Sequence, residues 1–194
     1  MKLYRYERKY KVKGIDEYAI EELLKSNKVR LKSIYKARQI NNIYMDTDDY
    51  DYYFENINGI NKRKKIRIRW YENLFGEINP QLEIKLKKGS IGKKEIYNIN
   101  SFTFSQINDA RNIKKIIQES DIPYEIKELI KYCRPTLINR YQRKYYRSID
   151  KLYRLTLDSD IYNYSPDFNL IDLKNLKDNE YILEIKYEER ICFI

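Results

Sequence analysis

Basic side chains recur at every second position in several segments of the chain. Arg67 and Arg69 are two residues apart, and so are Lys85 and Lys87. Successive side chains of a β-strand point to opposite faces, so residues two apart share a face. Two guanidinium groups on one face can each bind phosphate oxygens through two parallel hydrogen bonds. The spacing is therefore compatible with binding of an anion, and also with a charged strand face in water.

The composition restricts the chemistry that this chain can perform. Its 194 residues include 39 Lys and Arg against 29 Asp and Glu, and the formal net charge of +10 favours anionic partners. Histidine is absent, which excludes His-based triads, histidine acid–base catalysis and His-ligated metals. Cys133 and Cys192 are far apart and cannot form a zinc site by themselves; a reducing compartment fits them, and so does one disulfide.

Other classes are disfavoured by the residue pattern. No apolar run approaches the roughly 18–20 residues of a membrane-spanning helix, and the start of the chain lacks the apolar core of a signal peptide. We expect a cytoplasmic protein. Most of the 21 tyrosines are expected to be packing residues, so their alternation with lysines is poor evidence for stacking on nucleic acid bases.

The elements that must position the basic residues are mostly strands. Alternation of apolar with charged or polar residues predicts strands over 4–12, 38–46, 63–71, 81–88, 93–101, 137–147, 153–161 and 181–188. Apolar stripes predict helices over 16–27, 105–119 and 124–132, and an acidic, aromatic stretch predicts a short helix over 48–56. The polar residues 163–179 are expected to form a loop. Without a repeat or a linker, these elements predict one α+β domain over residues 1–194.

Two architectures accommodate strands that have one apolar face and one charged face. A β-sandwich buries the apolar faces between its sheets and leaves the charged faces in water. A closed barrel turns the charged faces inward, with helices over parts of the apolar outside. A charged lumen is costly unless a multivalent ion fills it. The alternation by itself leaves both architectures open.

Short motifs on the predicted strands resemble those of a known family. They are Glu7-Arg8-Lys9, Arg67-Ile68-Arg69, Glu83-Ile84-Lys85-Leu86-Lys87, Tyr141-Gln142-Arg143, Leu157-Asp158-Ser159-Asp160 and Glu184-Ile185-Lys186. Their order resembles that of the triphosphate tunnel metalloenzymes, the CYTH-like superfamily. Arg5-Tyr6-Glu7-Arg8-Lys9-Tyr10, Asn42-Ile43-Tyr44-Met45-Asp46-Thr47 and Asn139-Arg140-Tyr141-Gln142-Arg143 resemble its VTC branch, the polyphosphate polymerase domain. The resemblance covers residues 3–188.

This resemblance implies both a fold and an activity. The fold is an antiparallel β-barrel, the triphosphate tunnel, with helices packed outside. The activity is that of a polyphosphate polymerase, a phosphotransferase that moves the terminal phosphoryl of ATP or another nucleoside triphosphate onto a polyphosphate chain. In-line phosphoryl transfer needs mainly positioning and charge neutralisation, so the absence of histidine is compatible with it.

The resemblance also implies the residues of the site. The implied catalytic residues are Arg67, Arg69, Lys85 and Arg143. The implied phosphate-binding residues are Lys9, Arg67, Arg69, Lys85, Lys87, Tyr141, Arg143 and Lys186. A divalent metal, Mn²⁺ or Mg²⁺, is implied as cofactor, with Glu184 and Glu7 as its ligands.

Several of these roles have alternatives. Glu7 and Glu83 either assist the metal or form ion pairs with Lys9 and Lys85, and we favour the ion pairs. Tyr141 either donates a hydrogen bond to phosphate or fills space.

Asp158 is the remaining acidic residue of the motifs. It either ligates the metal or orients Arg154, and we favour the second.

The resemblance breaks near the end of the chain. Related domains continue past the Glu-x-Lys strand through a helix to a strand with a Ser-Lys signature, whereas this sequence ends at Ile194 without one. We therefore expect a tunnel that lacks one wall and an open strand edge that recruits a second copy. A triphosphate hydrolase and a non-catalytic triphosphate- or polyphosphate-binding module are the alternatives to a polymerase. Nucleic acid is disfavoured as a partner.

One prediction about strand faces follows from the shared spacing of the motifs. We predict that Lys9, Arg67, Arg69, Lys85, Arg143 and Glu184 converge on one cavity. The apolar residues Ile66, Ile68, Trp70, Leu155 and Leu183 are predicted to pack away from it.

Overall fold

The computed structural model describes residues 5–89, 91–107, 109–165 and 180–188. Its strands are β1 (Arg5–Lys13), β2 (Leu31–Asp46), β3 (Lys62–Tyr71), β4 (Glu77–Ile78), β5 (Gln81–Lys88), β6 (Ile91–Asn98), β7 (Phe102–Thr103), β8 (Arg134–Ser148), β9 (Arg154–Tyr164) and β10 (Glu180–Glu188). Its helices are α1 (Glu17–Ser26), α2 (Asp51–Ile57), α3 (Ala110–Glu119) and α4 (Tyr124–Lys131), with a 3₁₀ turn at Phe104–Ile107. The predicted α+β class is confirmed.

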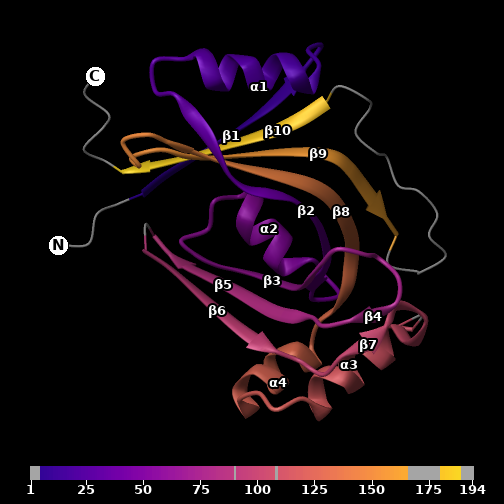
Figure 1. The fold of residues 1–194 in the computed structure, drawn as a ribbon. Helices are drawn as coiled ribbons and strands as arrows, with labels where there is room; N and C mark the ends of the chain where they lie inside the picture. The colour runs from indigo at the N-terminus through magenta and orange to yellow at the C-terminus, as the bar shows by residue number, and fades with distance from the viewer. Residues whose placement is uncertain (1–4, 90, 108, 166–179, 189–194) are drawn as a thin grey trace. The chain divides into compact units, whose positions relative to one another are not determined.

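Eight of the strands form one sheet, and β4 pairs with β7 in a second, small one. The order in the large sheet is β1-β10-β9-β8-β2-β3-β5-β6 (Figure 1). The pairs β1–β10, β10–β9, β2–β3, β3–β5 and β5–β6 are antiparallel. Closure of this sheet into a barrel stays a prediction.

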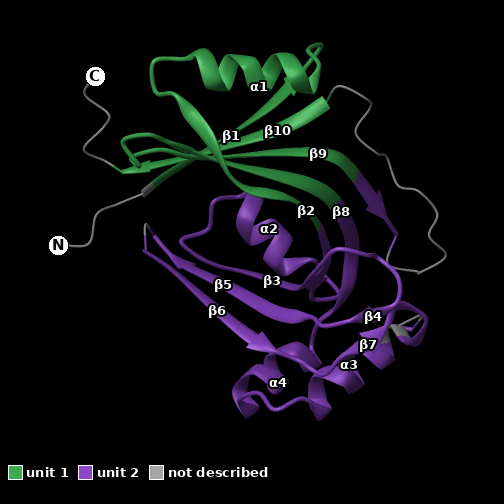
Figure 2. Ribbon diagram, in the orientation of Figure 1, with its two compact units in different colours: residues 1–39, 141–161, 175–194 green, residues 40–140, 162–174 purple. Residues whose placement is uncertain are grey.

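The chain divides into two compact units, which Figure 2 shows in different colours. Unit 1 comprises residues 1–39, 141–161 and 175–194, and unit 2 comprises residues 40–140 and 162–174. Strands β2, β8 and β9 each contribute residues to both units.

The core of unit 1 lies where α1 covers the apolar face of its strands. Asp16 caps the helix, because its carboxylate accepts a hydrogen bond of 2.7 Å from the backbone N–H of Ala19. Ile20 and Leu24 of α1 are buried against β9 residues of the same cluster. The cluster consists of Ile20, Leu24, Leu31, Tyr146, Leu155, Leu157 and Tyr181, with Leu183 and Ile185 packed against it. Leu155 and Leu183 thus lie in an apolar core, as the alternation predicts.

The core of unit 2 lies on the apolar face of β2, β3 and β5. Ile66, Ile68 and Trp70 belong to it, together with Ile113 and Ile117 of α3 and Ile130 of α4. Alternation along β3 places these apolar residues on one side of the strand and Arg67 and Arg69 on the other. The helices therefore cover the apolar face and leave the charged face available for other contacts.

The predicted elements agree with the structure except at particular ends and in three places. The short strands β4 and β7 were not predicted, and the helix predicted over 105–119 is a 3₁₀ turn at Phe104–Ile107 followed by α3. Strand β2 begins at Leu31 instead of residue 38, because residues 32–38 are exposed on both faces and carry no apolar alternation. Strand β9 continues to Tyr164, into the loop predicted over 163–179, and residues 166–179 lie outside the described part. Cys133 is a buried free thiol, whereas Cys192 lies outside the described residues. None of the helices in the described part is long and apolar enough to cross a membrane.

Truncation of Ile68 tests the assignment of the apolar face of β3. This side chain is 0% exposed, so Ile68→Ala leaves a cavity and should lower the free energy of unfolding by roughly 2–5 kcal/mol. Ile91→Ala, at a residue that is 65% exposed, is the control and should change it by less than about 0.5 kcal/mol. Urea denaturation measures both. Equal, small effects would contradict the assignment.

Candidate anion-binding site

Three lysines lie opposite one another on three adjacent strands of unit 2. The register pairs Lys65 of β3 with Lys85 of β5, and Lys85 with Lys94 of β6. Like charges directly opposite in a sheet destabilise it. The neighbouring positions on the same face carry Arg63, Arg67, Arg69 and Lys87. We call this surface, formed by Arg63, Lys65, Arg67, Arg69, Lys85, Lys87 and Lys94, the cationic face.

Glu83 is the carboxylate at the centre of the cationic face. It is 4% exposed, and it accepts hydrogen bonds of 2.7 Å from Arg67 Nε and of 2.7 Å from Lys94 Nζ. Burial acts to raise the pKa of Glu83, but the charges of Arg67 and Arg69 and the bonds from Arg67 and Lys94 outweigh it, so the pKa is lowered. The carboxylate therefore stays ionised.

Arg67 and Lys94 are partners of Glu83 that were not predicted from the sequence. Arg67 lies directly opposite Glu83 in the register, so its side chain starts close to the carboxylate. The expected ion pair of Glu83 with Lys85, two residues further along the same strand, stays a prediction.

Arg69 is held by a chain of buried amides. It is 7% exposed, and its Nε donates a hydrogen bond of 2.9 Å to Asn42 Oδ1. Asn42 Nδ2 donates to Asn139 Oδ1 at 3.4 Å, and Asn139 Nδ2 donates to Asn163 Oδ1 at 2.8 Å. Asn42 and Asn139 stand in motifs quoted above but were not predicted to act at the site. The sequence did contain a signal, because Asn42 and Asn139 each lie next to an isoleucine in a predicted strand. A buried amide needs hydrogen-bond partners, so an asparagine in a buried strand indicates a specific polar contact.

Tyr44 reports the positive potential of the cationic face. Burial acts to raise the pKa of its hydroxyl, but the positive charges of Lys65, Arg67 and Arg69 lower it, and the net direction is downward. The Lys65 ammonium lies 4.6 Å from the centre of the Tyr44 ring. A tyrosine with a lowered pKa indicates an environment that favours negative charge.

Glu7 and Lys9 of β1 and Glu184 and Lys186 of β10 form a group in which each lysine lies opposite a glutamate of the other strand. Lys9 Nζ lies 3.1 Å from Glu184 and 3.9 Å from Glu7, and Lys186 Nζ lies 2.7 Å from Glu184 and 3.6 Å from Glu7. Glu184 is 6% exposed; burial acts to raise its pKa, but the two lysines lower it to about 2. We call these residues the acidic–basic cluster. They confirm the ion-pair interpretation of Glu7 and Lys9.

Arg143 is fixed by a bidentate ion pair in unit 1. Its Nε and Nη2 lie 2.6 Å and 2.7 Å from the two carboxylate oxygens of Asp158. Burial opposes the charged form, but Asp158, Tyr141 and Glu184 together raise the pKa of Arg143, so it stays a cation. Asp158 therefore orients Arg143, and the expectation that it orients Arg154 is wrong. Arg143 of β8 reaches Asp158 from the neighbouring strand.

Tyr141 packs beside Arg143. The guanidinium carbon of Arg143 lies 5.1 Å from the centre of the Tyr141 ring, and Tyr141 is buried. This contact supports a packing role for the ring. A hydrogen bond from its hydroxyl to phosphate stays a prediction.

The acidic–basic cluster contains two carboxylates that one divalent ion could contact in place of the lysines. Each lysine nitrogen lies within 4 Å of both Glu7 and Glu184, so one cation between these carboxylates reaches both. Mg²⁺ and Mn²⁺ take oxygen ligands. In the described part of the chain, no group of three Asp, Glu, His or Cys side chains suits a metal. Phosphate oxygens and water would have to complete the coordination.

The structure groups the predicted site residues within each unit. Arg67, Arg69, Lys85 and Lys87 lie on the cationic face of unit 2, and Lys9, Arg143, Glu184 and Lys186 lie on the polar side of the unit 1 strands. Their convergence on one cavity stays a prediction.

Comparison with known proteins identifies the family of this chain. The family described as VTC domain matches residues 4–194. The chain belongs to the VTC domain family. The resemblance drawn from the strand motifs is therefore confirmed, and this VTC domain is a member of a triphosphate-handling family whose proteins typically use divalent metals.

Solved structures resemble the VTC domain at low sequence identity. A Vibrio parahaemolyticus protein described as an adenylate cyclase shares 10% identity at a TM-score of 0.50, over 94% of this chain and 75% of that one. HpAC1 from Hippeastrum, described as having a dominant triphosphatase activity, shares 16% identity at a TM-score of 0.45, over 93% of this chain and 79% of that one. PH1819 from Pyrococcus horikoshii shares 15% identity at a TM-score of 0.46, over 94% and 77%. At this low identity, the similarity of the VTC domain to the Vibrio protein shows that the two share a fold and nothing more. No curated protein matches the sequence.

Removal of the central lysine tests the repulsion on the cationic face. Salt should raise the free energy of unfolding of the wild type, because it screens the repulsion of Lys85 from Lys65 and Lys94. Lys85→Gln should reduce this rise by about 0.5 kcal/mol. Lys28→Gln, which removes an exposed charge in unit 1, is the matched control. An unchanged dependence on salt in Lys85→Gln would contradict the interpretation.

Acid titration tests the ion pairs of Glu184. Its pKa is lowered from 4.5 to about 2, so its contribution to stability is present above pH 4.5 and is lost as the pH falls towards 2. The free energy of unfolding of the wild type should therefore fall by ~2 kcal/mol more over this range than that of Glu184→Gln. Glu125→Gln, at an exposed carboxylate, should follow the wild type. Identical slopes for Glu184→Gln and wild type would refute the assignment.

Proposed function

We propose that this VTC domain is a polyphosphate polymerase-like phosphotransferase. In the proposed reaction an oxygen of the acceptor polyphosphate attacks the terminal phosphorus of ATP, the bond to the bridging oxygen breaks, and ADP leaves. The observation that supports this proposal most strongly is the row of lysines on the cationic face, beside Arg67 and Arg69. Cations placed opposite one another repel, so such a row suits a bound polyanion that spans several side chains.

The proposed reaction needs charge neutralisation more than proton transfer. The acceptor oxygen is already anionic, so no general base is required, in keeping with a chain that has no histidine. Arg67 and Arg69 are proposed to bind the transferred phosphoryl group, and Lys85 to hold the adjacent phosphates. The buried amide partner of Arg69 fixes its guanidinium before the ligand arrives, which lowers the cost of binding.

The residues of unit 1 are proposed to bind phosphate and a divalent metal. Arg143 is held by Asp158 and is proposed to bind a phosphate with its remaining donors. Lys9 and Lys186 are proposed to exchange carboxylate oxygens for phosphate oxygens when the ligand binds. Glu184 and Glu7 would then hold the divalent ion, which supplies charge neutralisation between phosphate groups.

Synthesis of polyphosphate tests the proposal directly. Purified protein with ATP and Mn²⁺ should yield polyphosphate, and Arg67→Ala and Glu184→Ala should each abolish it. Polymer is resolved by gel electrophoresis, and free phosphate is measured in the same samples. Lys28→Gln, which changes a charge outside both clusters, should retain activity. Free phosphate in place of polymer would identify a hydrolase.

Thermal shift with tripolyphosphate separates an enzyme from a binding module. Tripolyphosphate at 100 times its dissociation constant should stabilise the protein by about 2.7 kcal/mol. Stabilisation without polymer or free phosphate would identify a non-catalytic binding module. Absence of both stabilisation and product would refute the proposed function.

A further inference from the structure

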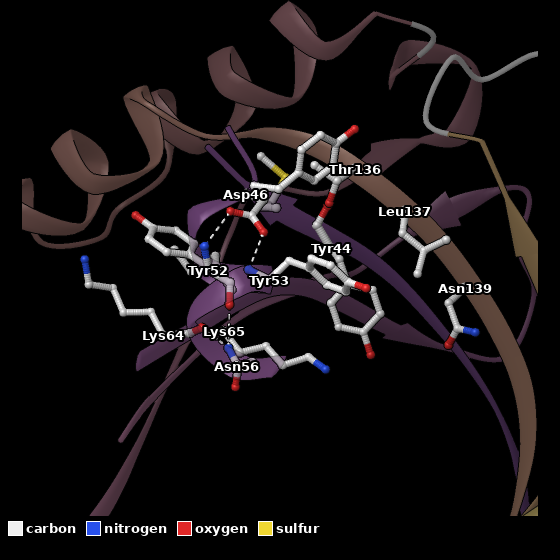
Figure 3. A pocket seen from close by; sticks show the side chains of 13 residues that line it. Tyr44, Asp46, Tyr52, Tyr53, Asn56, Lys64, Lys65, Thr136, Leu137 and Asn139 are labelled. Atoms are coloured by element: carbon white, nitrogen blue, oxygen red, sulfur yellow. Dashed lines mark hydrogen bonds between the residues drawn. The ribbon is translucent and has the colours of Figure 1, made fainter. Parts of the chain in front are cut away.

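A cavity of about 620 Å³ lies in unit 2 next to the cationic face (Figure 3). Tyr44 and Lys65, which lie on or beside that face, line one part of it, and Tyr50, Tyr52 and Tyr53 around the start of α2 line another. Its volume falls within the range of roughly 300–1,000 Å³ that is typical of small-molecule sites. None of the phosphate-binding residues predicted from the sequence lines this cavity.

The backbone that carries two of the aromatic side chains of the cavity is held by a carboxylate. The backbone N–H groups of Tyr52 and Tyr53 each donate a hydrogen bond of 2.9 Å to the carboxylate of Asp46, as Figure 3 shows. These bonds anchor the first turn of α2, from which both rings extend. Aromatic walls held by a short, capped helix lose little conformational entropy when a flat ligand binds between or against them.

Tyr50 is held by a second set of contacts. The guanidinium carbon of Arg134 lies 5.0 Å from the centre of the Tyr50 ring, and Arg134 Nε lies 2.9 Å from Asp48 Oδ1. The backbone of Tyr50 has a φ of 58°, a left-handed conformation that bulky residues rarely adopt. Strain of this kind persists where the surrounding structure requires one particular position of a side chain.

The surface of the cavity is mainly apolar, and the polar side chains in its wall, besides the tyrosines, are Asp46, Asn56, Lys64, Lys65, Thr136 and Asn139. Asn56 Nδ2 donates hydrogen bonds of 2.7 Å to the carbonyl of Tyr52 and of 2.7 Å to that of Lys64, so both of its amide hydrogens are used. Its oxygen is then the group that it offers to a ligand, and a carbonyl oxygen accepts from an amino group. Flat aromatic surfaces with a small number of polar groups suit an aromatic heterocycle.

Lys65 connects the cavity with the cationic face. It lines the cavity, and it is also the first lysine of the row that continues through Lys85 and Lys94. A ligand with an aromatic heterocycle at one end and several phosphates at the other matches this sequence of surfaces. Tyr44, whose ring lies beside the Lys65 ammonium, borders both.

We infer that this cavity binds the base of a nucleoside triphosphate whose phosphates extend over the cationic face. The inference rests on the proposed function, which places phosphates on that face. The base site would let the protein distinguish the phosphoryl donor, a nucleoside triphosphate, from the polyphosphate product. A nucleotide contacts both the cavity and the cationic face, whereas tripolyphosphate or polyphosphate contacts only the face.

Tyr53→Ala is the variant that tests this inference. The Tyr53 side chain is 55% exposed, and its anchoring hydrogen bond comes from the backbone, so the substitution preserves the fold of α2. It should weaken ATP binding about tenfold, within the range expected when a stacked aromatic ring is removed. It should change the affinity for tripolyphosphate less than about twofold. Tyr124→Ala, at a 71% exposed tyrosine of α4 outside the cavity, should leave both affinities unchanged.

Saturation-transfer NMR observes the base itself. With the wild-type protein and ATP, saturation should reach the adenine H2 and H8 protons, and with Tyr53→Ala it should fall. Adenosine should show the same dependence at higher concentration. Absence of transfer to the adenine protons, or equal weakening of ATP and tripolyphosphate by Tyr53→Ala, would overturn the inference.

ATP, adenosine and tripolyphosphate together test the base site separately from the proposed function. If tripolyphosphate binds and no saturation is transferred to the adenine protons of ATP, the base site is refuted and the proposed phosphate site stands. If adenosine binds in a Tyr53-dependent way and tripolyphosphate does not bind, the base site stands and the proposed function is refuted.

Discussion

Repulsion among the cations of β3, β5 and β6 is the constraint on which the unit 2 site depends. Lys65, Lys85 and Lys94 are held opposite one another because the register of their strands is fixed from the other side of the sheet. There Ile66 and Ile84 are paired and buried in the core with α3 and α4. A slip of one residue would expose these apolar side chains, and its cost exceeds the electrostatic strain of the lysine row. The core thus enforces a charge distribution that the charged residues would not adopt by themselves.

The two units differ in how their charges are balanced. In unit 1, Lys9 and Lys186 share the carboxylates of Glu7 and Glu184, and Arg143 faces Asp158. In unit 2, Glu83 faces Arg67 and Lys94, and further cations surround it. The unit 1 charges are therefore largely neutralised within the protein, whereas the cationic face retains an excess. We expect salt and anions to act mainly on unit 2, and acid to act mainly on Glu184.

Buried amides determine how precisely the cations are placed. Asn42 is 0% exposed and bonds to both Arg69 and Asn139. A neutral acceptor orients the Arg69 guanidinium without cancelling its charge, whereas Asp158 orients Arg143 at the expense of neutralising it. The same principle applies beside the cavity, where Asp46 is used to cap α2 and leaves the aromatic rings to line the wall. These polar groups of unit 2 thus position side chains that we propose to contact the ligand.

The sequence by itself determined the strand faces and the family. Alternation along residues 63–71 and 81–88 was sufficient to separate Ile66 and Ile68 from Arg67, Arg69 and Lys85, because the period of a strand is two. The order of the short motifs was sufficient to identify the family. Residues 32–38, which lack apolar alternation, gave no such signal, and the start of β2 was missed for that reason.

Only the tertiary structure decided which charges meet. The pairing of Glu83 with Arg67, and the choice of Arg143 over Arg154 as the partner of Asp158, depend on which residues of neighbouring strands lie side by side. Register joins residues far apart in sequence, and alternation within one strand carries no information about it. The cavity at α2 likewise needs Tyr44, Tyr53 and Thr136 to be brought together from separate segments. Their spacing along the chain contains no trace of that contact, because packing of the core creates it.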